Sequence, residues 1–392
     1  MPVIPRALDL HGELTAIRRD IHAHPELGFE ENRTADIVAA KLAEFGCEVH
    51  RGLAKTGVVG TLRRGNAPRS IGLRADMDAL PMQERNEFAH RSTHDGKMHA
   101  CGHDGHTAML LGAAKYLAET RNFEGAVHVI FQPAEEALGG GRAMVEEGLF
   151  DQFPCDAVFA LHNKPGLPLG HMATRPGPLL AAADSWDIRI EGRGSHAAHP
   201  HLGIDPLVIG AEIVLALQTV ASRSVDPIES AVVTVGFMQG GTTYNVIPDD
   251  LHIGGTSRSF RPAVRDLVER RIGEIARGIA AAHGATAALD YRRRYPPTIN
   301  HAAEAAFAAD VAAEICGADA VSRSCPPVMG AEDFSYMLNA RPGAMLWLGN
   351  GPGEGGCLLH NPNYDFNDEA LPIGASAAGG EVSGGAGVGD AG

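Results

Sequence analysis

Short apolar runs alternate with longer amphipathic stretches along the first half of this chain. Continuous apolar runs of strand length occupy residues 58–62, 71–75, 127–131 and 158–161. Residues 13–46 and 107–117 instead carry apolar side chains three and four positions apart, which is the spacing of a buried helix face. A sequence in which strand and helix patterns alternate predicts an α/β core, with helices packed on a sheet.

The pattern changes near residue 185. Strand patterns lie at 186–190, 231–236, 251–260 and 286–291, and helix patterns lie at 206–220 and 267–282. The resulting order of strand, helix, strand, strand, helix, strand is that of a ferredoxin-like α+β unit. We therefore predict a mixed-sheet α/β catalytic domain formed by residues 1–183 and 298–376. An inserted ferredoxin-like domain at 184–297 would interrupt it.

The end of the chain differs from the rest in composition. After Pro372 the sequence consists almost entirely of Gly, Ala and Ser and offers few large apolar groups to a core. Such a composition is typical of flexible tails. We expect residues 377–392 to form a disordered tail.

Charge and composition narrow the range of partners. The 392 residues carry a formal net charge of −15, whereas proteins that bind nucleic acid or anionic membranes present basic surfaces. No apolar run approaches the ~20 residues of a membrane span, and residues 1–10 lack the apolar region of a secretory signal. The six cysteines show no disulfide-type spacing. We expect a cytoplasmic protein with reduced thiols that binds neither nucleic acid nor membrane.

Potential metal ligands gather where predicted strands end. They are Cys101 and His103 in the turn Cys-Gly-His-Asp-Gly-His, Glu135 and Glu136 after the next apolar run, and His162 after the following one. In α/β sheets the active site lies at the carboxyl ends of the strands. Thiolate, imidazole and carboxylate are ligands that zinc-type ions accept, and a catalytic site keeps one position open for water.

The adjacent carboxylates of Glu135 and Glu136 suggest that one binds metal while the other accepts a proton from water. Asp76 and Asp78 follow another apolar run and reach the same edge of the sheet. Each residue alone is weak evidence, because histidines and glutamates are common in turns and on surfaces. A structural zinc site is disfavoured, since such sites are usually closed by several cysteines and only Cys101 lies among the other ligands.

Longer motifs carry a family resemblance. In chain order they are RRDIHAHPELGFEE (18–31), RADMDALP (74–81), MHACGHDGHTAMLLGAA (98–114), FQPAEE (131–136), LHN (161–163), GRGSHAAHPHLGIDP (192–206), GGTTYNVIPDD (240–250), MGAEDFSYM (329–337) and LHNPNYDFND (359–368). Together they resemble the aminoacylase-type dinuclear metallohydrolases. Within that family the chain is most similar to the subgroup of hippurate hydrolase and the auxin-conjugate amidohydrolases.

The resemblance implies roles for individual residues. The ligands of two divalent metal ions would be Cys101, His103, Glu136, His162 and His360, and His360 is assigned by the resemblance alone. Glu135 would act as general base and acid, and Asp76 would be a carboxylate that orients a ligand. Manganese or zinc are the expected metals, with cobalt and nickel as further candidates.

The resemblance also implies that the inserted domain is a lid and the contact of a homodimer, or of a dimer of dimers. His196 would reach the partner subunit's active site and stabilise the oxyanion. Asn245 and Arg258 would bind the free carboxylate of the substrate. A guanidinium group suits this task because it pairs with a carboxylate through two hydrogen bonds.

The implied function is hydrolysis of the amide bond of N-acyl-L-amino acids, such as hippurate-like or N-acetyl compounds, by a metal-activated water. A carboxypeptidase or dipeptidase would use the same residues, and a panel of free dipeptides beside N-acyl amino acids distinguishes the two. A non-catalytic metal-binding protein is disfavoured because Glu135 and the five ligand positions are all present.

Overall fold

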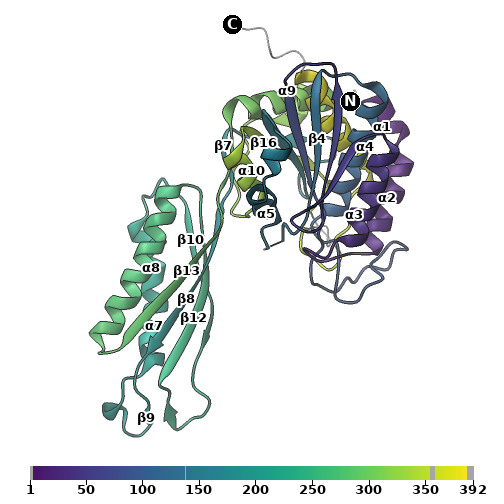
Figure 1. The fold of residues 1–392 in the computed structure, drawn as a ribbon. Helices are drawn as coiled ribbons and strands as arrows, with labels where there is room; N and C mark the ends of the chain where they lie inside the picture. Colours follow the sequence, from purple (N-terminus) through teal and green to yellow (C-terminus); the bar gives the residue numbers. More distant parts are fainter. Residues whose placement is uncertain (1–2, 137, 354–357, 386–392) are drawn as a thin grey trace. The chain divides into compact units, whose positions relative to one another are not determined.

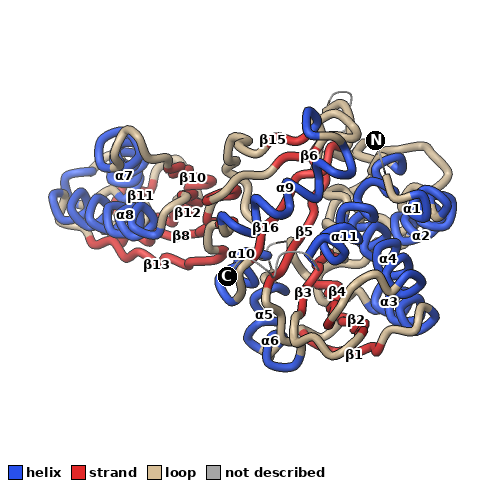
Figure 2. Tube along the Cα trace, turned by 90° about the horizontal axis from the view of Figure 1, so that it is seen from above, coloured by secondary structure: helices blue, strands red, loops and turns tan. Residues whose placement is uncertain are grey.

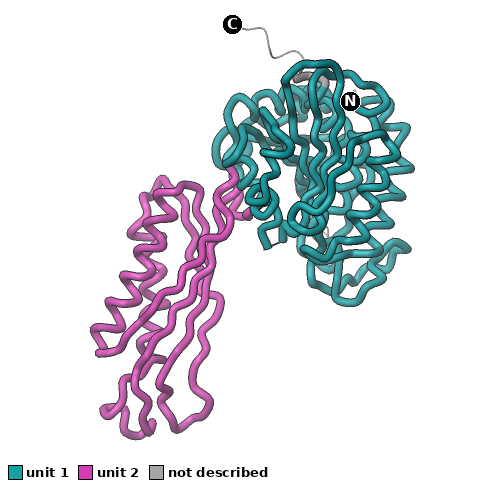
Figure 3. Tube along the Cα trace, in the orientation of Figure 1, with its two compact units in different colours: residues 1–179, 299–326, 333–392 teal, residues 180–298, 327–332 magenta. Residues whose placement is uncertain are grey.

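The computed structural model describes residues 3–136, 138–353 and 358–385, and the chain divides into two compact units (Figure 3). Unit 1 comprises Met1–Leu179, Ile299–Pro326 and Asp333–Gly392, and unit 2 comprises Leu180–Thr298 and Pro327–Glu332. The segment 184–297, expected as an inserted domain, lies within unit 2. Cys357 and residues 386–392 of the expected tail lie outside the described residues.

Unit 1 contains an eight-stranded mixed sheet (Figure 1). In spatial order its strands are β1 (Glu48–Leu53), β2 (Gly57–Arg64), β4 (Gly125–Gln132), β3 (Ser70–Asp76), β5 (Ala157–Lys164), β16 (Gly343–Gly349), β6 (Met172–Ala173) and β15 (Val321–Ser322). The four strands β4, β3, β5 and β16 run parallel, whereas β1 and β2 are antiparallel to their neighbours. The apolar runs predicted as strands in the first half of the chain all lie within this sheet.

Helices cover both faces of the sheet (Figure 2). One face carries α3 (Asn32–Glu44), α4 (His103–Thr120), α9 (Ala302–Cys316) and α11 (Leu371–Gly385), with α1 (Pro5–Asp9) and α2 (His11–Ala23) packed outside them. The other face carries α5 (Gly140–Glu146), α6 (Leu149–Gln152) and α10 (Phe334–Ala340). This layered α/β arrangement is the one that the alternating pattern predicts.

The buried helix α4 begins earlier than its apolar pattern indicates. The pattern predicts a start at Thr107, and the helix starts at His103, directly after Gly102. Gly102 has a left-handed backbone with φ of 93°, and a Cβ atom there would lie 2.4 Å from Oδ1 of Asn163. Position 102 therefore requires glycine for two reasons, the backbone conformation and the close contact.

The expectation of a disordered tail is wrong for the described part of residues 377–392. The chain forms α11 over Leu371–Gly385, and this helix packs against α4 and α9. Ala377, Ala378 and Val382 are buried. Small side chains let helices approach closely, and alanine has the highest helix propensity, so this packing offsets the cost of the glycines. A reading based only on large apolar groups misses such a helix.

Unit 2 has the order of elements predicted for a ferredoxin-like unit. Its main elements are β8 (Ala182–Glu191), α7 (Pro206–Thr219), β10 (Ala231–Gln239), β12 (Asp250–Ser259), α8 (Pro262–Ala282) and β13 (Thr286–Tyr295). The sheet order is β10-β12-β8-β13, and all neighbours are antiparallel. The short strands β9 (Ser195–His196) and β11 (Val246–Ile247) pair with each other. Two further short strands, β7 (Gly177–Leu180) and β14 (Thr298–Asn300), lie where the chain passes between the units.

One helical segment of unit 2 has the length and composition of a membrane span. Pro206–Ser224, which includes α7, has 19 residues, and its most apolar 18-residue window has a mean hydropathy of 1.3 and is 28% buried. Ile209 and Ile213 lie in the core of unit 2, whereas Val208 and Leu215 are exposed. The core helix of a soluble domain passes the same length test. The absence of a membrane partner therefore stays a prediction.

Candidate metal centre

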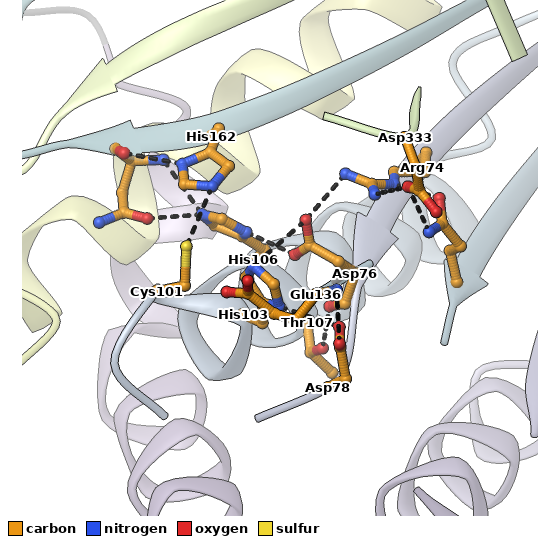
Figure 4. A network of polar contacts seen from close by, with 12 residues as sticks. Arg74, Asp76, Asp78, Cys101, His103, His106, Thr107, Glu136, His162 and Asp333 are labelled. Carbon is orange, nitrogen blue, oxygen red and sulfur yellow. Dashed lines mark hydrogen bonds and ion pairs between the residues drawn. The ribbon is translucent and has the colours of Figure 1, made fainter. Parts of the chain in front are cut away.

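The carboxyl ends of the parallel strands in unit 1 place the candidate ligands at one edge of the sheet (Figure 4). Strand β3 ends at Asp76, which lies in register with Gln132 at the end of β4. Glu135 and Glu136 follow β4, and His162 lies near the end of β5. The edge that the sequence predicts as the active site is thus formed by neighbouring strands.

Side chains of the predicted ligand positions meet at this edge. Ligand atoms lie within 4.8 Å of one another in each of two groups, which are Cys101, Glu136 and His360, and His103, Glu135 and Glu136. The Sγ atom of Cys101 also lies 3.5 Å from Nε2 of His162. The structure therefore brings all five predicted ligand residues together, with Glu135 beside them. Because Glu136 belongs to both groups, the two groups adjoin.

His103 has one ring nitrogen held and the other open. Its Nδ1 lies 3.1 Å from Oδ1 of Asp78, and its buried Nε2 has no hydrogen-bond partner among the described residues. The second oxygen of Asp78 accepts a hydrogen bond from the backbone N–H of Glu136 at 2.9 Å. A histidine held at Nδ1 by a carboxylate presents a basic Nε2, which is the usual arrangement of a metal ligand.

His162 is held in a similar way. Its Nδ1 donates a hydrogen bond to the backbone carbonyl of Asn163 at 2.8 Å, so Nε2 faces the thiol of Cys101. Burial lowers the pKa of His162 well below its usual value. The imidazole is therefore neutral, as a metal ligand must be.

The role expected of Asp76, to orient a ligand, stays a prediction. Its side chain lies in a further group of ligand atoms within 4.8 Å of one another, together with those of His103, His106 and His162. Its Oδ1 lies 2.6 Å from Nδ1 of His106, and its nearest approach to a predicted ligand is 3.7 Å, to Nε2 of His103. The carboxylate that orients His103 is Asp78. His106 has both nitrogens occupied, since its Nε2 lies 2.8 Å from Oδ1 of Asn163. His106 is therefore a connecting residue behind the ligands.

Anionic groups at the site favour a bound cation. Hydrogen bonds to Cys101 and Glu136 raise the pKa of His360 to about 10, and its Nε2 lies 3.1 Å from Oε1 of Glu136. Burial acts to lower the pKa of His103, but the charges of Asp76 and Cys101 outweigh it and raise this pKa well above its usual value. Histidines hold protons in this way where negative charge gathers. Thiolate, carboxylate and imidazole donors at such a place fit divalent ions.

Glu135 is buried, with 6% of its surface exposed, and follows a residue with an unusual backbone conformation. Ala134 has a positive φ of 54°, and its N–H donates a hydrogen bond to Oε1 of Glu31 at 2.8 Å. Glu31 in turn accepts a hydrogen bond from the hydroxyl of Thr56 at 2.6 Å. Strained backbone of this kind is typical of functional sites. Glu31 thus holds the turn that directs Glu135 and Glu136 into the centre.

A buried charge network behind the ligands was missed in the sequence. Arg18 and His22 on α2 lie 3.6 Å and 2.8 Å from Oδ2 of Asp104, the residue after His103. Arg18 also pairs with Asp365 at 2.7 Å, in the segment that follows His360. The guanidinium therefore links the two segments that carry Cys101, His103 and His360. In the sequence, the motif at 18–31 is the signal that could have pointed to this network. Spacing alone does not show which residues Arg18 and His22 contact.

The residues predicted to bind substrate from the inserted domain lie at two ends of unit 2. His196 and Asn245 are close together, because the backbone N–H of Ala197 donates a hydrogen bond to the carbonyl of Asn245 at 3.0 Å. Arg258 lies near the opposite end of β12, and the stretch from Asp250 to Arg258 spans about 26 Å at the usual strand rise. A single chain therefore does not bring Asn245 and Arg258 to one small ligand.

The sheet, its ligand edge and the inserted unit together define an α/β metallohydrolase. The chain belongs to the peptidase family M20/M25/M40, whose family model matches residues 72–379. The matched region begins in β3 and ends in α11, so it includes all of unit 2 and part of unit 1.

Individual relatives agree with this assignment. Hippurate hydrolase of Campylobacter jejuni is 44% identical over 376 residues, which cover 96% of this chain and 97% of the relative. The IAA-amino acid hydrolase ILR1-like 4 of Arabidopsis thaliana is 41% identical, over 94% of this chain and 84% of the relative. A solved dinuclear metal binding peptidase of the M20 family from Bacillus subtilis has a TM-score of 0.84 at 34% identity, over 96% of this chain and 98% of that chain. The resemblance inferred from the motifs is confirmed.

Proposed function

We propose that this protein is a metal-dependent amidohydrolase that hydrolyses the amide bond of N-acyl-L-amino acids. The main support is that buried Glu135 belongs to one of two groups of ligand atoms, and that Glu136 is shared by both groups. A general base next to bound metal is what hydrolases use to activate water. The 44% identity with a hippurate hydrolase supports hippurate-like substrates.

In this proposal two divalent metal ions are held by Cys101, His103, Glu136, His162 and His360. When bound, the ions would polarise the amide carbonyl and lower the pKa of water. The thiolate and the imidazoles favour zinc, and the carboxylate donor also suits manganese, with cobalt and nickel as further candidates.

Glu135 has two tasks in the proposed reaction. Its carboxylate takes a proton from the attacking water and passes that proton to the amide nitrogen as the C–N bond breaks. The products are a carboxylic acid and a free amino acid. Hydrogen bonds to Glu31 and Asp78 hold the backbone on both sides of Glu135, so little reorganisation is needed.

The proposed site is completed by a second subunit. Nδ1 of His196 accepts a hydrogen bond from the backbone N–H of Ala198 at 3.0 Å, so a neutral ring carries its proton on Nε2 and can donate it to an oxyanion. Because His196 and Asn245 lie at the end of unit 2 opposite Arg258, a substrate would meet these two from one subunit and Arg258 from the other. Arg258 would bind the free carboxylate of the substrate, so esters of that carboxylate should be poor substrates.

An exposed apolar surface on unit 2 supports a homodimer. It is formed by α7 and the edge strand β10, where Val208, Leu215, Phe237 and Met238 are exposed. β10 has a neighbouring strand on one side only, so its outer edge carries backbone groups that can pair with a second copy. Two-fold pairing would cover both copies of this surface. A dimer of dimers would require a further contact.

We also propose a cytoplasmic location. The five cysteines among the described residues are free and buried, which suits a reducing compartment. The partners in this proposal are a small N-acyl amino acid and a second copy of the chain, and they include no nucleic acid and no membrane.

The substitution Glu135→Gln tests the proposed general base. Because the amide cannot take up a proton from water, we expect hydrolysis of N-benzoylglycine to fall by about 10²–10⁴-fold. The metal content, measured by mass spectrometry after dialysis, should stay close to that of the wild type. Glu146→Gln removes an exposed carboxylate far along α5 and serves as the control. Near-normal turnover in Glu135→Gln would contradict the proposed role.

A further inference from the structure

Unit 1 contains a cavity at the edge of the sheet opposite the candidate metal ligands. It is lined by Ser70, Ala126 and Ala157, near the first residues of β3, β4 and β5, and by parts of α9 and α11. Its volume of ≈ 390 Å³ is within the range of small-molecule sites. The ligands lie where the strands end and this cavity lies where they begin. The two sites are therefore separate.

The cavity lining combines aromatic rings with carboxylates. The rings are those of Phe123, Phe159 and Phe307, and the last two lie with their centroids 5.7 Å apart. The carboxylates are those of Glu124, Asp156, Glu304 and Glu381, and Arg69 is the one basic residue among the described lining residues. Aromatic faces and carboxylates both attract cations. The lining therefore favours a positively charged ligand with an apolar part.

Glu381 distinguishes this cavity from an ordinary packing defect. Its side chain on α11 is 2% exposed, and no hydrogen bond or ion pair joins it to any residue that the structure describes. Other buried carboxylates of unit 1 are paired, as Asp104 is with His22. A buried carboxyl group without a partner destabilises a protein. Accordingly, burial raises the pKa of Glu381 to about 8.

We propose that this cavity binds an organic ammonium ion with an apolar body. The ammonium group pairs with Glu381, and the body packs on Phe159 and Phe307. A bare metal ion fits less well, because it needs several oxygen ligands around one point. Here Glu381 is buried, whereas Glu124 and Asp156 are exposed. The four carboxylates of the lining disfavour an anionic ligand, because they would repel it. The site is independent of the proposed hydrolysis, since none of these residues belongs to the metal centre.

Calorimetric titration of the full-length, metal-loaded protein with 2-phenylethylammonium tests this proposal. We expect saturable binding of one ion per chain, and binding to Glu381→Gln that is weaker by about tenfold, or about 1.4 kcal/mol. Glu314→Gln removes an exposed carboxylate from α9 outside the cavity and should bind like the wild type. 2-Phenylethanol, which has the same body without the charge, should bind the wild type more weakly than the amine does.

Absence of binding at millimolar amine would overturn the proposal and leave an empty cavity. Binding that Glu381→Gln leaves unchanged would also overturn it, because the amine would then lie elsewhere. If Glu381→Gln does not fold, Phe307→Ala and the comparison of amine with alcohol supply the same test. Hydrolysis of N-benzoylglycine by the same samples reports on the metal centre. A failure here is thereby distinguished from a failure of the proposed function.

Discussion

At the scale of single residues, the candidate centre depends on the groups that hold the ligands as much as on the ligands. His103 and His162 each have Nδ1 occupied by an oxygen of the protein, so both present Nε2. Asp78 holds His103 with one oxygen and the backbone of Glu136 with the other. Residues in such contacts usually matter for metal affinity nearly as much as the ligands themselves.

The sequence made part of this centre predictable. Glu136 and His162 follow strand patterns, and strand ends meet at one edge of a sheet. Cys101 stands in the Cys/His turn just before the helix pattern at 107–117. His360 follows no such pattern, because it lies in a loop. Its backbone has a positive φ of 59°, and its N–H donates a hydrogen bond to the carbonyl of Ala100. Only the family resemblance suggested it. The roles of Asp76 and Asp78 were not separable, since both end one strand and the pattern does not say which side chain reaches a ligand.

The buried His22 predicts a pH dependence of stability. Burial acts to lower its pKa, but the nearby carboxylates of Asp104 and Glu84 outweigh this effect and raise it from 6.5 to about 9. Protonated His22 therefore stabilises the native state fully below pH 6.5, and this contribution is lost as the pH rises through about 9. Between these values the free energy of unfolding should fall by about 1–3 kcal/mol more in the wild type than in His22→Gln.

Urea unfolding of the metal-free protein at several pH values measures this difference. His24→Gln is the control, because it removes a half-buried histidine that directly follows α2, and it should behave like the wild type. Parallel pH profiles for the wild type and His22→Gln would show that His22 is not protonated in the folded protein.

At the scale of elements, strands and amphipathic helices were predictable because large apolar groups mark them. The start of α4 and the existence of α11 were not predictable, and the reason is the same for both. Both depend on small residues, with Gly102 permitting a left-handed turn and the alanines of α11 permitting close packing on α4 and α9. A sequence rich in glycine and alanine is usually interpreted as flexible, but tertiary contacts can make these residues part of a core.

A shortened chain tests the contribution of α11. A chain that ends at residue 376 loses the buried Ala377, Ala378 and Val382 and exposes the surfaces they cover. We expect its free energy of unfolding to be lower than that of the full chain by about 2–4 kcal/mol. A chain that ends at residue 385 retains the helix and is the matched control. Equal stability of the chains ending at 376 and 385 would support a disordered tail.

At the scale of the whole molecule, the two units carry different parts of the proposed chemistry. Unit 1 carries the metal ligands and Glu135, and unit 2 carries His196, Asn245 and Arg258. Because His196 and Arg258 are far apart along unit 2, we do not expect one chain to bring both to the same substrate molecule. The sequence predicted the ferredoxin-like order of unit 2, but distances along its sheet emerge only from the fold.

Mixing two inactive variants tests whether His196 acts across a dimer. In a heterodimer of Glu135→Gln and His196→Ala, one site has an intact Glu135 and receives an intact His196 of the partner subunit. After exchange of subunits we expect about one quarter of wild-type hydrolysis to return. Each variant alone is the control. If the mixture stays inactive although light scattering shows mixed dimers, His196 acts within its own chain or not at all.

Hydrolysis of N-benzoylglycine and N-acetyl-amino acids by metal-stripped protein, after zinc, manganese, cobalt or nickel is restored, tests the proposed metal-dependent amidohydrolase activity. We expect no turnover without metal, and turnover with at least one of these ions that requires both the acyl amide and the free carboxylate of the substrate. Protein that binds metal at the strand-end ligands, yet cleaves only free dipeptides or no amide at all, would contradict the proposed activity.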